Sequence, residues 1–336
     1  MRKFVRQNLI SFLASPLGSP IRLLIPAWRG RCRLFPRGLV IYADGRVTTC
    51  CMDALGQQTL GSVYAESLEQ IWRREASRFF SQGLFTSDLC RRCIDSPRAP
   101  IFGGQPSRRE WKKAAEGYLS LLIVEIMACC NYGCCDARDM RPYRQATKAD
   151  LGRMFNAIQG VLPHLQEMVL FNVGESLLHE GFCDFVRRCR AETDANLLLS
   201  TNGLLLDSKI AECLIEERLN KLIVSVHGGP GTENMLKYSQ YGADYDRVLA
   251  NVARLVKLRD SKGSNFPLVE LRATLFEWND SDELMDRLRA DARAVGASLA
   301  WTVDWAGSTA PRASKRFLPG SAALLALKER GELCEF

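Results

Sequence analysis

The feature that most constrains the fold of this 336-residue chain is an alternation of short apolar runs with amphipathic segments, which begins at residue 118. The apolar runs have the length of buried strands, and the segments between them carry apolar residues at helical spacing. Because helices of this length carry the chain back across the face of a sheet, the strands must be parallel. The predicted strands are YLSLLIVEIM (118–127), EMVLFNV (167–173), ANLLLS (195–200), KLIVSV (221–226), LVELRATL (268–275) and LAWTVDW (299–305), and the predicted helices span 148–159, 180–190, 207–217, 245–258 and 281–295.

Six strand–helix units are too few for a closed eight-stranded barrel. Only about thirty residues follow the sixth predicted strand, whereas two further units need roughly twice that length. We therefore predict an α/β fold with an open sheet or partial (β/α)6 barrel, preceded by a small N-terminal cysteine-rich α+β domain. In such folds ligands bind at the carboxyl ends of the strands. Glycines or small polar residues follow four of these strands, where backbone amides can approach a polar ligand closely.

The chain contains thirteen cysteines, and most of them are clustered. A secreted disulfide-rich protein would combine dispersed cysteines with a signal peptide. Residues 1–28 have a basic start, but prolines and an arginine interrupt their apolar run, so this segment is a poor signal peptide and its apolar run is too short to span a bilayer. We therefore expect a cytoplasmic protein whose clustered thiolates bind a metal or an iron–sulfur cluster.

Charge narrows the choice of partners only weakly. The net charge of +7 comes from 45 basic and 38 acidic residues, and the excess is spread along the chain. Aromatic and basic residues are not interleaved, so a nucleic-acid partner is not indicated. The basic and apolar residues 1–30 are expected to form a helix that packs on the chain's own domain, with peripheral contact to a membrane as the alternative.

Residues 39–50, LVIYADGRVTTC, predict a β-hairpin, because two short β-rich runs flank an Asp-Gly pair, a favoured tight turn. Such a hairpin brings Cys50 back beside Cys32. The later segment SLEQIWRREASRFF predicts a helix with Ser67 as its N-cap. Together these elements predict a small module built around its cysteines.

A Cys-x2-Cys pair, Cys90 and Cys93, follows that helix. A turn of this length aligns both sulfurs toward one metal. Together with Cys32 and Cys50 the pair provides four thiolates for a single site, and Cys51 is the alternative to Cys50. On ligand type alone, the site fits zinc as well as an iron–sulfur cluster.

A second cysteine cluster lies in MACCNYGCCDARDM (127–140), where four cysteines fall within seven positions directly after the first predicted strand. This motif, together with LFNVGESLLHEGF, LLLSTNGLLLD and LIVSVHG at the next strands, resembles the radical S-adenosylmethionine (SAM) superfamily. The resemblance covers nearly all of residues 118–305, in order. It implies a loop that binds a [4Fe–4S] cluster through Cys-x3-Cys-x2-Cys, with one iron open to SAM, which is reduced to give a 5′-deoxyadenosyl radical.

The resemblance assigns Cys130 and Cys134 as ligands of that cluster, but the third cysteine of the motif falls at Ala137, which cannot ligate iron. Cys135 is the substitute that the loop offers. Asp136 stands where relatives place an aromatic residue against the adenine, and its oxygens would suit a soft cluster poorly.

The other motifs imply residues that contact SAM. Gly174 and Glu175 retain the Gly-Glu pair whose backbone would meet the SAM amino group. Ser200 and Asn202 belong to an intact STNG motif, where relatives contact the carboxylate or the ribose of SAM. His227 stands where relatives often have aspartate, and a lone histidine at a strand end is more often structural. Catalytic residues are not assigned.

The first cysteine module resembles the SPASM/twitch extension of many radical SAM proteins, which binds an auxiliary [4Fe–4S] cluster. The resemblance implies Cys32, Cys50, Cys90 and Cys93 as its ligands, in a module that precedes the SAM-binding part instead of following it. The predicted organisation is a basic and apolar segment at 1–30, the SPASM/twitch-like domain at 31–94, a linker at 95–117, the radical SAM-like partial barrel at 118–305 and a C-terminal tail or helix at 306–336.

Two functions from different classes follow. The first is a radical SAM/SPASM-type enzyme that modifies a peptide or protein, or a small sugar-like molecule, with electrons from an external donor. The second is a degenerate, non-catalytic homologue that binds a peptide or a partner beside an active paralogue. The retained SAM motifs favour the first, and Ala137 favours the second. Trp301, Asp304 and Trp305 suit a pocket lining, although core packing explains the tryptophans equally well.

Overall fold

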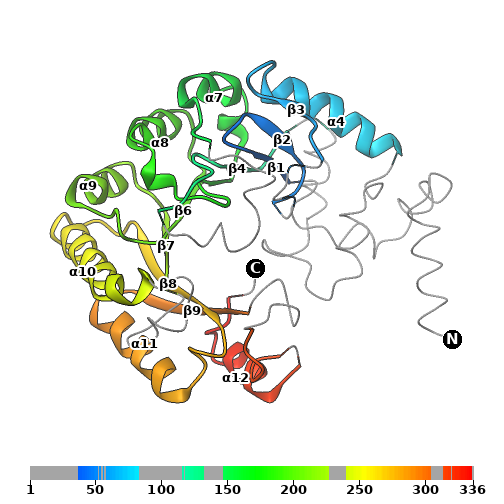
Figure 1. The fold of residues 1–336 in the computed structure, drawn as a ribbon. Helices are drawn as coiled ribbons and strands as arrows, with labels where there is room; N and C mark the ends of the chain where they lie inside the picture. Colours follow the sequence, from blue (N-terminus) through cyan, green and yellow to red (C-terminus); the bar gives the residue numbers. More distant parts are fainter. Residues whose placement is uncertain are drawn as a thin grey trace, which may run out of the picture.

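A computed structural model of the protein describes residues 37–51, 53, 56, 58–82, 116, 118–131, 147–226, 240–303, 313–318 and 320–334. The named strands in these ranges form one nine-stranded sheet with the order β3-β2-β1-β4-β5-β6-β7-β8-β9. Its two end strands, β3 and β9, are not neighbours in this order, so the sheet is open. Figure 1 shows it curving, with helices arranged around its outside. The predicted α/β partial barrel is confirmed.

The six strands and five helices predicted from residue 118 onward are confirmed, with boundaries shifted by a few residues. Neighbouring strands from β4 to β9 pair in parallel. Apolar residues at helical spacing drive each helix onto the sheet; in α7, for example, Met154, Phe155 and Ile158 are buried. The strands are β4 (Leu121–Val124), β5 (Glu167–Val169), β6 (Asn196–Thr201), β7 (Lys221–Ser225), β8 (Leu268–Leu275) and β9 (Ser298–Val303), and the helices are α7 (Leu151–Ile158), α8 (Phe182–Glu192), α9 (Ser208–Glu216), α10 (Gln240–Ser261) and α11 (Asp282–Ala294), with short 3-10 turns η3 (Leu162–His164) and η4 (Ser176–Leu178).

The cysteine-bearing hairpin joins this sheet at its edge. Strands β1 (Gly38–Ile41) and β2 (Arg46–Thr48) form the predicted antiparallel pair, and Gly45 occupies the tight turn with a φ of +84°, a conformation that glycine adopts without strain. Strand β1 also pairs in parallel with β4 along its whole length. The hairpin and the parallel strands therefore form one continuous sheet.

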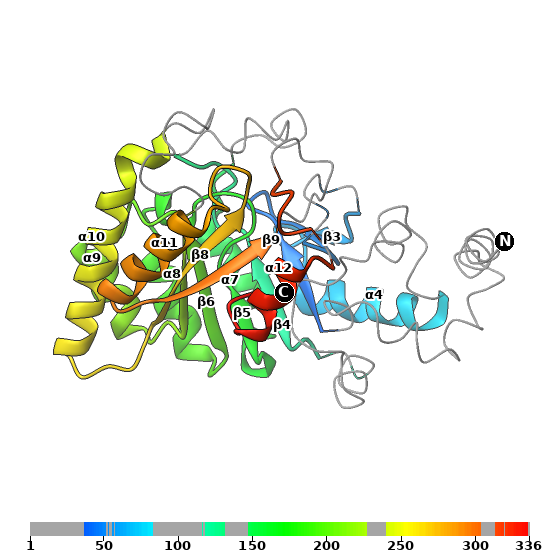
Figure 2. The same ribbon diagram turned by 90° about the horizontal axis from the view of Figure 1, so that it is seen from below.

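Helix α4 (Leu68–Gln82) follows β3 (Gly61–Ser62), the short strand at the edge of the sheet. Ser67 caps this helix as predicted, because its hydroxyl accepts a hydrogen bond from Gln70 N at 3.3 Å. The Gln70 side chain in turn accepts from Ser67 N at 2.9 Å, and this reciprocal capping box fixes where the helix begins. In both views α4 and α10 lie far apart (Figure 1 and Figure 2).

Side chains alternate between the two faces of the sheet, as the pleat requires. The outer face, under the helices, holds the main core, which includes Leu122 and Val124 of β4. On β8 the positions that alternate with core residues carry Glu270 and Arg272, which form an ion pair, so the inner face is charged toward β9. Toward β1 the inner face is apolar, with a cluster made of Val40, Tyr42, Leu121, Ile123 and Val169.

The last described residues cover the β9 edge of the sheet. After helix α12 (Ala322–Glu329) the chain runs along β9, where Trp301 N donates to Glu332 O and Cys334 N donates to Trp301 O, both at 2.7 Å. Trp301 is fully buried in the main core, so core packing accounts for this residue. Among the described helices none is long and apolar enough to cross a bilayer.

Candidate functional site

The carboxyl ends of β4, β5 and β6 form a polar rim organised by Glu175. Its side chain is 2% exposed. Oε1 accepts hydrogen bonds from Leu177 N at 3.1 Å and from Thr201 Oγ1 at 2.9 Å, and Oε2 accepts one from Asn202 N at 2.8 Å. Burial raises the pKa of Glu175, and these three hydrogen bonds oppose the rise. This side chain therefore ties the loop after β5 to the end of β6.

Gly174 lets the same loop rest directly on the segment that carries the cysteines. A Cβ at this position would lie 1.9 Å from Met127 O and 2.7 Å from Cys129 O, both of them backbone atoms. Glu175 N donates to that Cys129 oxygen at 2.9 Å. Only glycine fits so close a backbone approach, because no side-chain rotation could relieve the contact.

Asn202 places its side chain beside the first cysteine of the predicted cluster loop. Its Nδ2 lies 2.6 Å from Asn131 Oδ1 and 3.8 Å from Cys130 Sγ. Its Oδ1 accepts from Leu204 N at 3.1 Å, which orients the amide so that its NH2 group faces the cysteine. A donor beside sulfur favours the thiolate, the form that binds iron. Ser200 is half-buried near the end of the same strand.

The structure thus brings Cys130, Gly174, Glu175 and Asn202 to one rim. Their contacts with SAM stay a prediction, and so does the way in which the cysteine loop is completed. The other residues singled out for this rim or for the strand ends lie outside the described residues: Cys134, Cys135, Asp136, Ala137, His227, Asp304 and Trp305.

The auxiliary site is described only in part. Cys50 is half-buried and lies two residues after β2, and its role as a ligand stays a prediction. Cys51 packs against the apolar cluster of the inner face that includes Tyr42. In the described part of the chain, no group of three or more His, Cys, Asp or Glu side chains could hold a metal ion. The other three predicted ligands, Cys32, Cys90 and Cys93, lie outside the described residues.

The described donors fit an iron–sulfur cluster by their chemistry. Cys50 and Cys130 offer soft thiolate ligands, and both are partly accessible at the ends of strands. Cys189 differs, because it is buried in the main core and burial raises the pKa of its thiol to about 12. Of the described free cysteines, Cys189 is therefore the one placed for packing alone.

No sequence motif marks the pairing of Cys183 with Cys213. Neither residue has ligand spacing in the sequence, and in the structure the two form a disulfide between α8 and α9, with Cα atoms 6.0 Å apart. Their sequence separation is 30, and only the packing of the two neighbouring helices brings them together.

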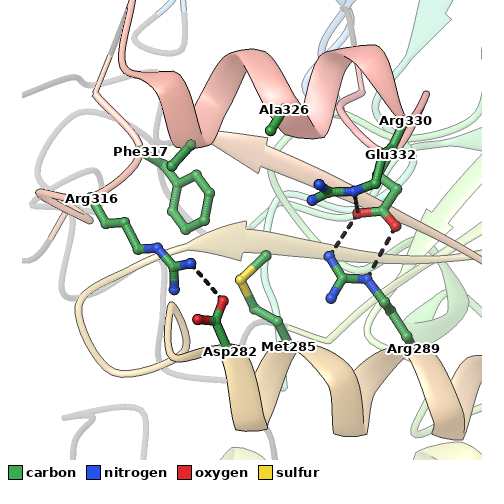
Figure 3. A pocket seen from close by; sticks show the side chains of 9 residues that line it. Asp282, Met285, Arg289, Arg316, Phe317, Ala326, Arg330 and Glu332 are labelled. Carbon is green, nitrogen blue, oxygen red and sulfur yellow. Dashed lines mark hydrogen bonds and ion pairs between the residues drawn. The ribbon is translucent and has the colours of Figure 1, made fainter.

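A cavity of about 440 Å³ lies between α11 and α12 (Figure 3). Its apolar floor is bordered by ion pairs, of which the best aligned joins Arg289 to Glu332 through two hydrogen bonds. None of the described residues that line it is a cysteine, and these residues lie at the β9 edge of the sheet, away from the polar rim. The residues around it are Asp282, Met285, Arg289, Arg316, Phe317, Ala323, Ala326, Arg330 and Glu332.

Comparison with known proteins identifies the first cysteine module. The SPASM family, described as an iron–sulfur cluster-binding domain, matches residues 32–94. This match confirms the predicted resemblance of this part of the chain to SPASM. No curated protein matches the chain.

Several solved structures are similar in fold over part of their length. SuiB from Streptococcus suis is 13% identical with a TM-score of 0.42, over 70% of this chain and 50% of its own. SuiB bound to its precursor peptide SuiA is 14% identical with a TM-score of 0.42, over 72% and 55%. Native anSMEcpe with bound AdoMet and the Cp18Cys peptide is 18% identical with a TM-score of 0.39, over 54% and 50%. The chain therefore spans about half the length of these proteins.

Proposed function

We propose that this chain is a radical SAM/SPASM-type iron–sulfur enzyme that modifies a peptide or protein, or a small sugar-like molecule. The observation that supports this proposal is that the SPASM-matched region and the parallel strands share one sheet. The hairpin of the SPASM-matched region pairs with β4, the strand that leads to Cys130. At the end of β4, Gly174, Glu175 and Asn202 assemble the rim to which the resemblance assigns SAM.

The auxiliary [4Fe–4S] cluster would be held by the four thiolates of the SPASM-matched region. The match to an iron–sulfur domain favours such a cluster over zinc. Cys51 remains the alternative to Cys50, but its packing against the apolar cluster favours Cys50 as the ligand. The proposed ligands are Cys32, Cys50, Cys90 and Cys93.

The SAM-binding cluster would be held by Cys130 and Cys134, with Cys135 as the third ligand in place of Ala137. When bound, it supplies the one-electron reduction of SAM, with electrons from an external donor. The chain's own part is to orient the ligands. The Asn202 amide faces Cys130, and Glu175 fixes the rim by accepting hydrogen bonds from two backbone N–H groups and the Thr201 hydroxyl.

Ala137 favours a second candidate function. A chain that keeps the auxiliary cluster but lacks the third thiolate would bind a peptide or a partner protein without cleaving SAM. In that case it would act in the cytoplasm as a subunit beside an active paralogue.

Anaerobic reconstitution with iron and sulfide separates the two functions. We expect about eight irons per chain if both sites fill and about four if only the auxiliary site fills. Reduced protein with SAM should then release 5′-deoxyadenosine in the first case and none in the second. Reconstituted protein that binds no iron would overturn both proposals.

The variant Ala137→Cys tests the loop directly. If the wild type binds about four irons because the loop lacks only one ligand, this variant should raise the iron content to about eight per chain. Cys334→Ser is the matched control, because Cys334 lies at the β9 edge and should leave the iron content unchanged. A value for Ala137→Cys that stays at four would mean that the loop geometry, and the alignment of the motif with it, is wrong.

A further inference from the structure

Glu125 is a fully buried carboxylate that the proposed chemistry does not use. It directly follows β4, five positions before Cys130, and its side chain is 0% exposed. By the alternation along the strand it points to the inner face, the side of Leu121 and Ile123. A carboxylate buried beside an apolar cluster is costly unless its oxygens are hydrogen-bonded.

The carboxylate joins three separate pieces of the fold. Oε2 accepts a hydrogen bond from Asn172 Nδ2 at 3.0 Å, and Asn172 belongs to the loop that leads to Gly174. Oε1 accepts a longer hydrogen bond, 3.4 Å, from Ala43 N in the turn of the hairpin. The backbone N–H of Glu125 donates to Ile41 O at 2.8 Å, which continues the pairing of β4 with β1. One side chain therefore links the hairpin, the cysteine-bearing strand and the loop of the rim.

Ala43 is held from its other side as well. Its carbonyl accepts a hydrogen bond from Tyr64 Oη at 3.1 Å, and the same hydroxyl accepts one from Asp150 N, at the start of α7, at 2.8 Å. The guanidinium of Arg153 lies 4.8 Å from the centre of the Tyr64 ring. Burial raises the pKa of Tyr64, so its hydroxyl keeps the proton that it donates. The hairpin turn is therefore clamped between Glu125 and Tyr64.

We propose that Glu125 is a positioning residue that fixes the hairpin carrying Cys50 against the strand that leads to Cys130, so that the placements of the two cysteine loops depend on one another. Strand pairing alone fixes the register of β1 beside β4, but it ends at Ile41. The hydrogen bonds of Ala43 with Glu125 and Tyr64 also fix the turn that follows β1. A carboxylate suits the position because it only accepts hydrogen bonds and so matches two N–H donors. The coupling of two clusters rests on the proposed function.

The first test is hydrogen exchange of the full-length protein without added iron. In Glu125→Gln the side-chain NH2 would face an N–H donor, so the amide of Ala43 should exchange about tenfold faster as the hairpin turn loosens. Tyr64→Phe removes the hydroxyl on the other side of Ala43 while keeping the ring, and it should act in the same direction. Glu167→Gln is the matched control, since Glu167 lies on the same face of the neighbouring strand β5 but at its amino end.

The second test is spectroscopic and uses reconstituted protein. At equal iron content, Glu125→Gln should change the electron paramagnetic resonance spectrum of the reduced auxiliary cluster, and Glu167→Gln should not. A loss of global stability alone would not alter this spectrum in the protein that stays folded. The side chain of Glu125→Asp is one methylene too short to reach both donors. This variant should therefore also differ from the wild type in the spectrum of the auxiliary cluster.

The outcomes separate this inference from the proposed function. If the wild-type chain binds no iron, the proposed function fails, and hydrogen exchange still decides whether Glu125 holds the hairpin. If the wild-type chain binds iron but Glu125→Gln matches Glu167→Gln in both tests, and Tyr64→Phe matches it in hydrogen exchange, the positioning role of Glu125 is wrong.

Discussion

Two carboxylates beside different parts of the sheet show two ways in which this fold uses charge. Glu175 lies at the polar rim, is 2% exposed and accepts hydrogen bonds from neutral donors. Glu332 lies beside β9, with 25% of its side chain exposed, and pairs with Arg289 and Arg330. Burial raises the pKa of Glu175. Burial acts in the same direction on Glu332 but is outweighed by the two arginines, so the pKa of Glu332 is lowered.

The difference follows from what each carboxylate organises. Glu175 fixes backbone N–H groups in a region shielded from water, where hydrogen bonds are strong and insensitive to salt, so it can hold the geometry of a binding rim. Glu332 holds the chain after α12 through ion pairs that water and salt weaken. The first arrangement is typical of a site, and the second is typical of the docking of a terminal segment.

Among the substitutions that test this difference, the one at Glu175 should have the largest effect on stability. Glu175→Ala leaves three buried donors without their acceptor, and each such loss costs about 1 to 3 kcal/mol. We therefore expect the free energy of unfolding of the full-length chain to fall by about 3 kcal/mol or more. Urea denaturation followed by circular dichroism measures this change.

Glu180→Ala is the matched control for that variant. Glu180 is five positions further along the same loop, but its side chain is 73% exposed and pairs with Lys148 at the surface. This substitution should leave the free energy of unfolding unchanged. If the free energy of unfolding fell equally in both variants, the buried hydrogen bonds of Glu175 would not contribute to stability. Glu175 would then not differ from an exposed carboxylate such as Glu332 in the way described here.

The parallel part of the fold could be predicted from the sequence because its signals are local. Each strand is a short apolar run and each helix a periodic one, so β8 appears at the predicted residues 268–275. The cap at Ser67 and the turn at Gly45 were also readable, since both depend on neighbouring residues. At the rim, the order of the motifs along the chain was enough to predict that Cys130 and Asn202 lie at the same edge of the sheet.

The contacts that could not be predicted are those between distant segments. Nothing local indicates that β1 pairs with β4, because about eighty residues of chain separate them and strand partners are chosen by tertiary packing. The disulfide between Cys183 and Cys213 was missed for the same reason. Glu125 did leave a signal, a lone acid inside the apolar run LLIVEIM, but its partners Ala43 and Asn172 lie in other loops.

A smaller effect, with opposite signs at the two carboxylates, is expected in the pH dependence of stability. A carboxyl whose pKa is raised in the folded state stabilises it at low pH, and this contribution is lost as pH rises from the ordinary value of 4.5 through the raised pKa. The stability difference between the wild type and Glu175→Gln should therefore shift against the wild type as pH rises above 4.5. For Glu332 the lowered pKa reverses the sign, because its contribution is present above 4.5 and is lost as pH falls through the lowered value.

Denaturation of the wild type, Glu175→Gln and Glu332→Gln between about pH 2 and pH 7 measures both slopes, the one for Glu332 below 4.5 and the one for Glu175 above it. The two glutamine variants serve as controls for each other, since each removes one titrating carboxyl of the same kind. Slopes of the same sign would show that the two carboxylates experience similar surroundings, contrary to the hydrogen-bond partners seen here.

The smallest expected effect is at the bidentate pair beside the cavity of Figure 3. Arg289 donates to Glu332 from Nε at 3.1 Å and from Nη2 at 2.7 Å, with both side chains partly exposed. Arg289→Lys keeps the charge but loses the two-pronged geometry, so we expect a loss of about 0.5 to 1 kcal/mol that shrinks as salt is added. Lys315→Ala, which breaks the more exposed pair with Glu277, should have no measurable effect. A loss at Arg289 that persists in high salt would instead mean that the carboxylate of Glu332 is held as firmly as that of Glu175, since only contacts shielded from water escape screening.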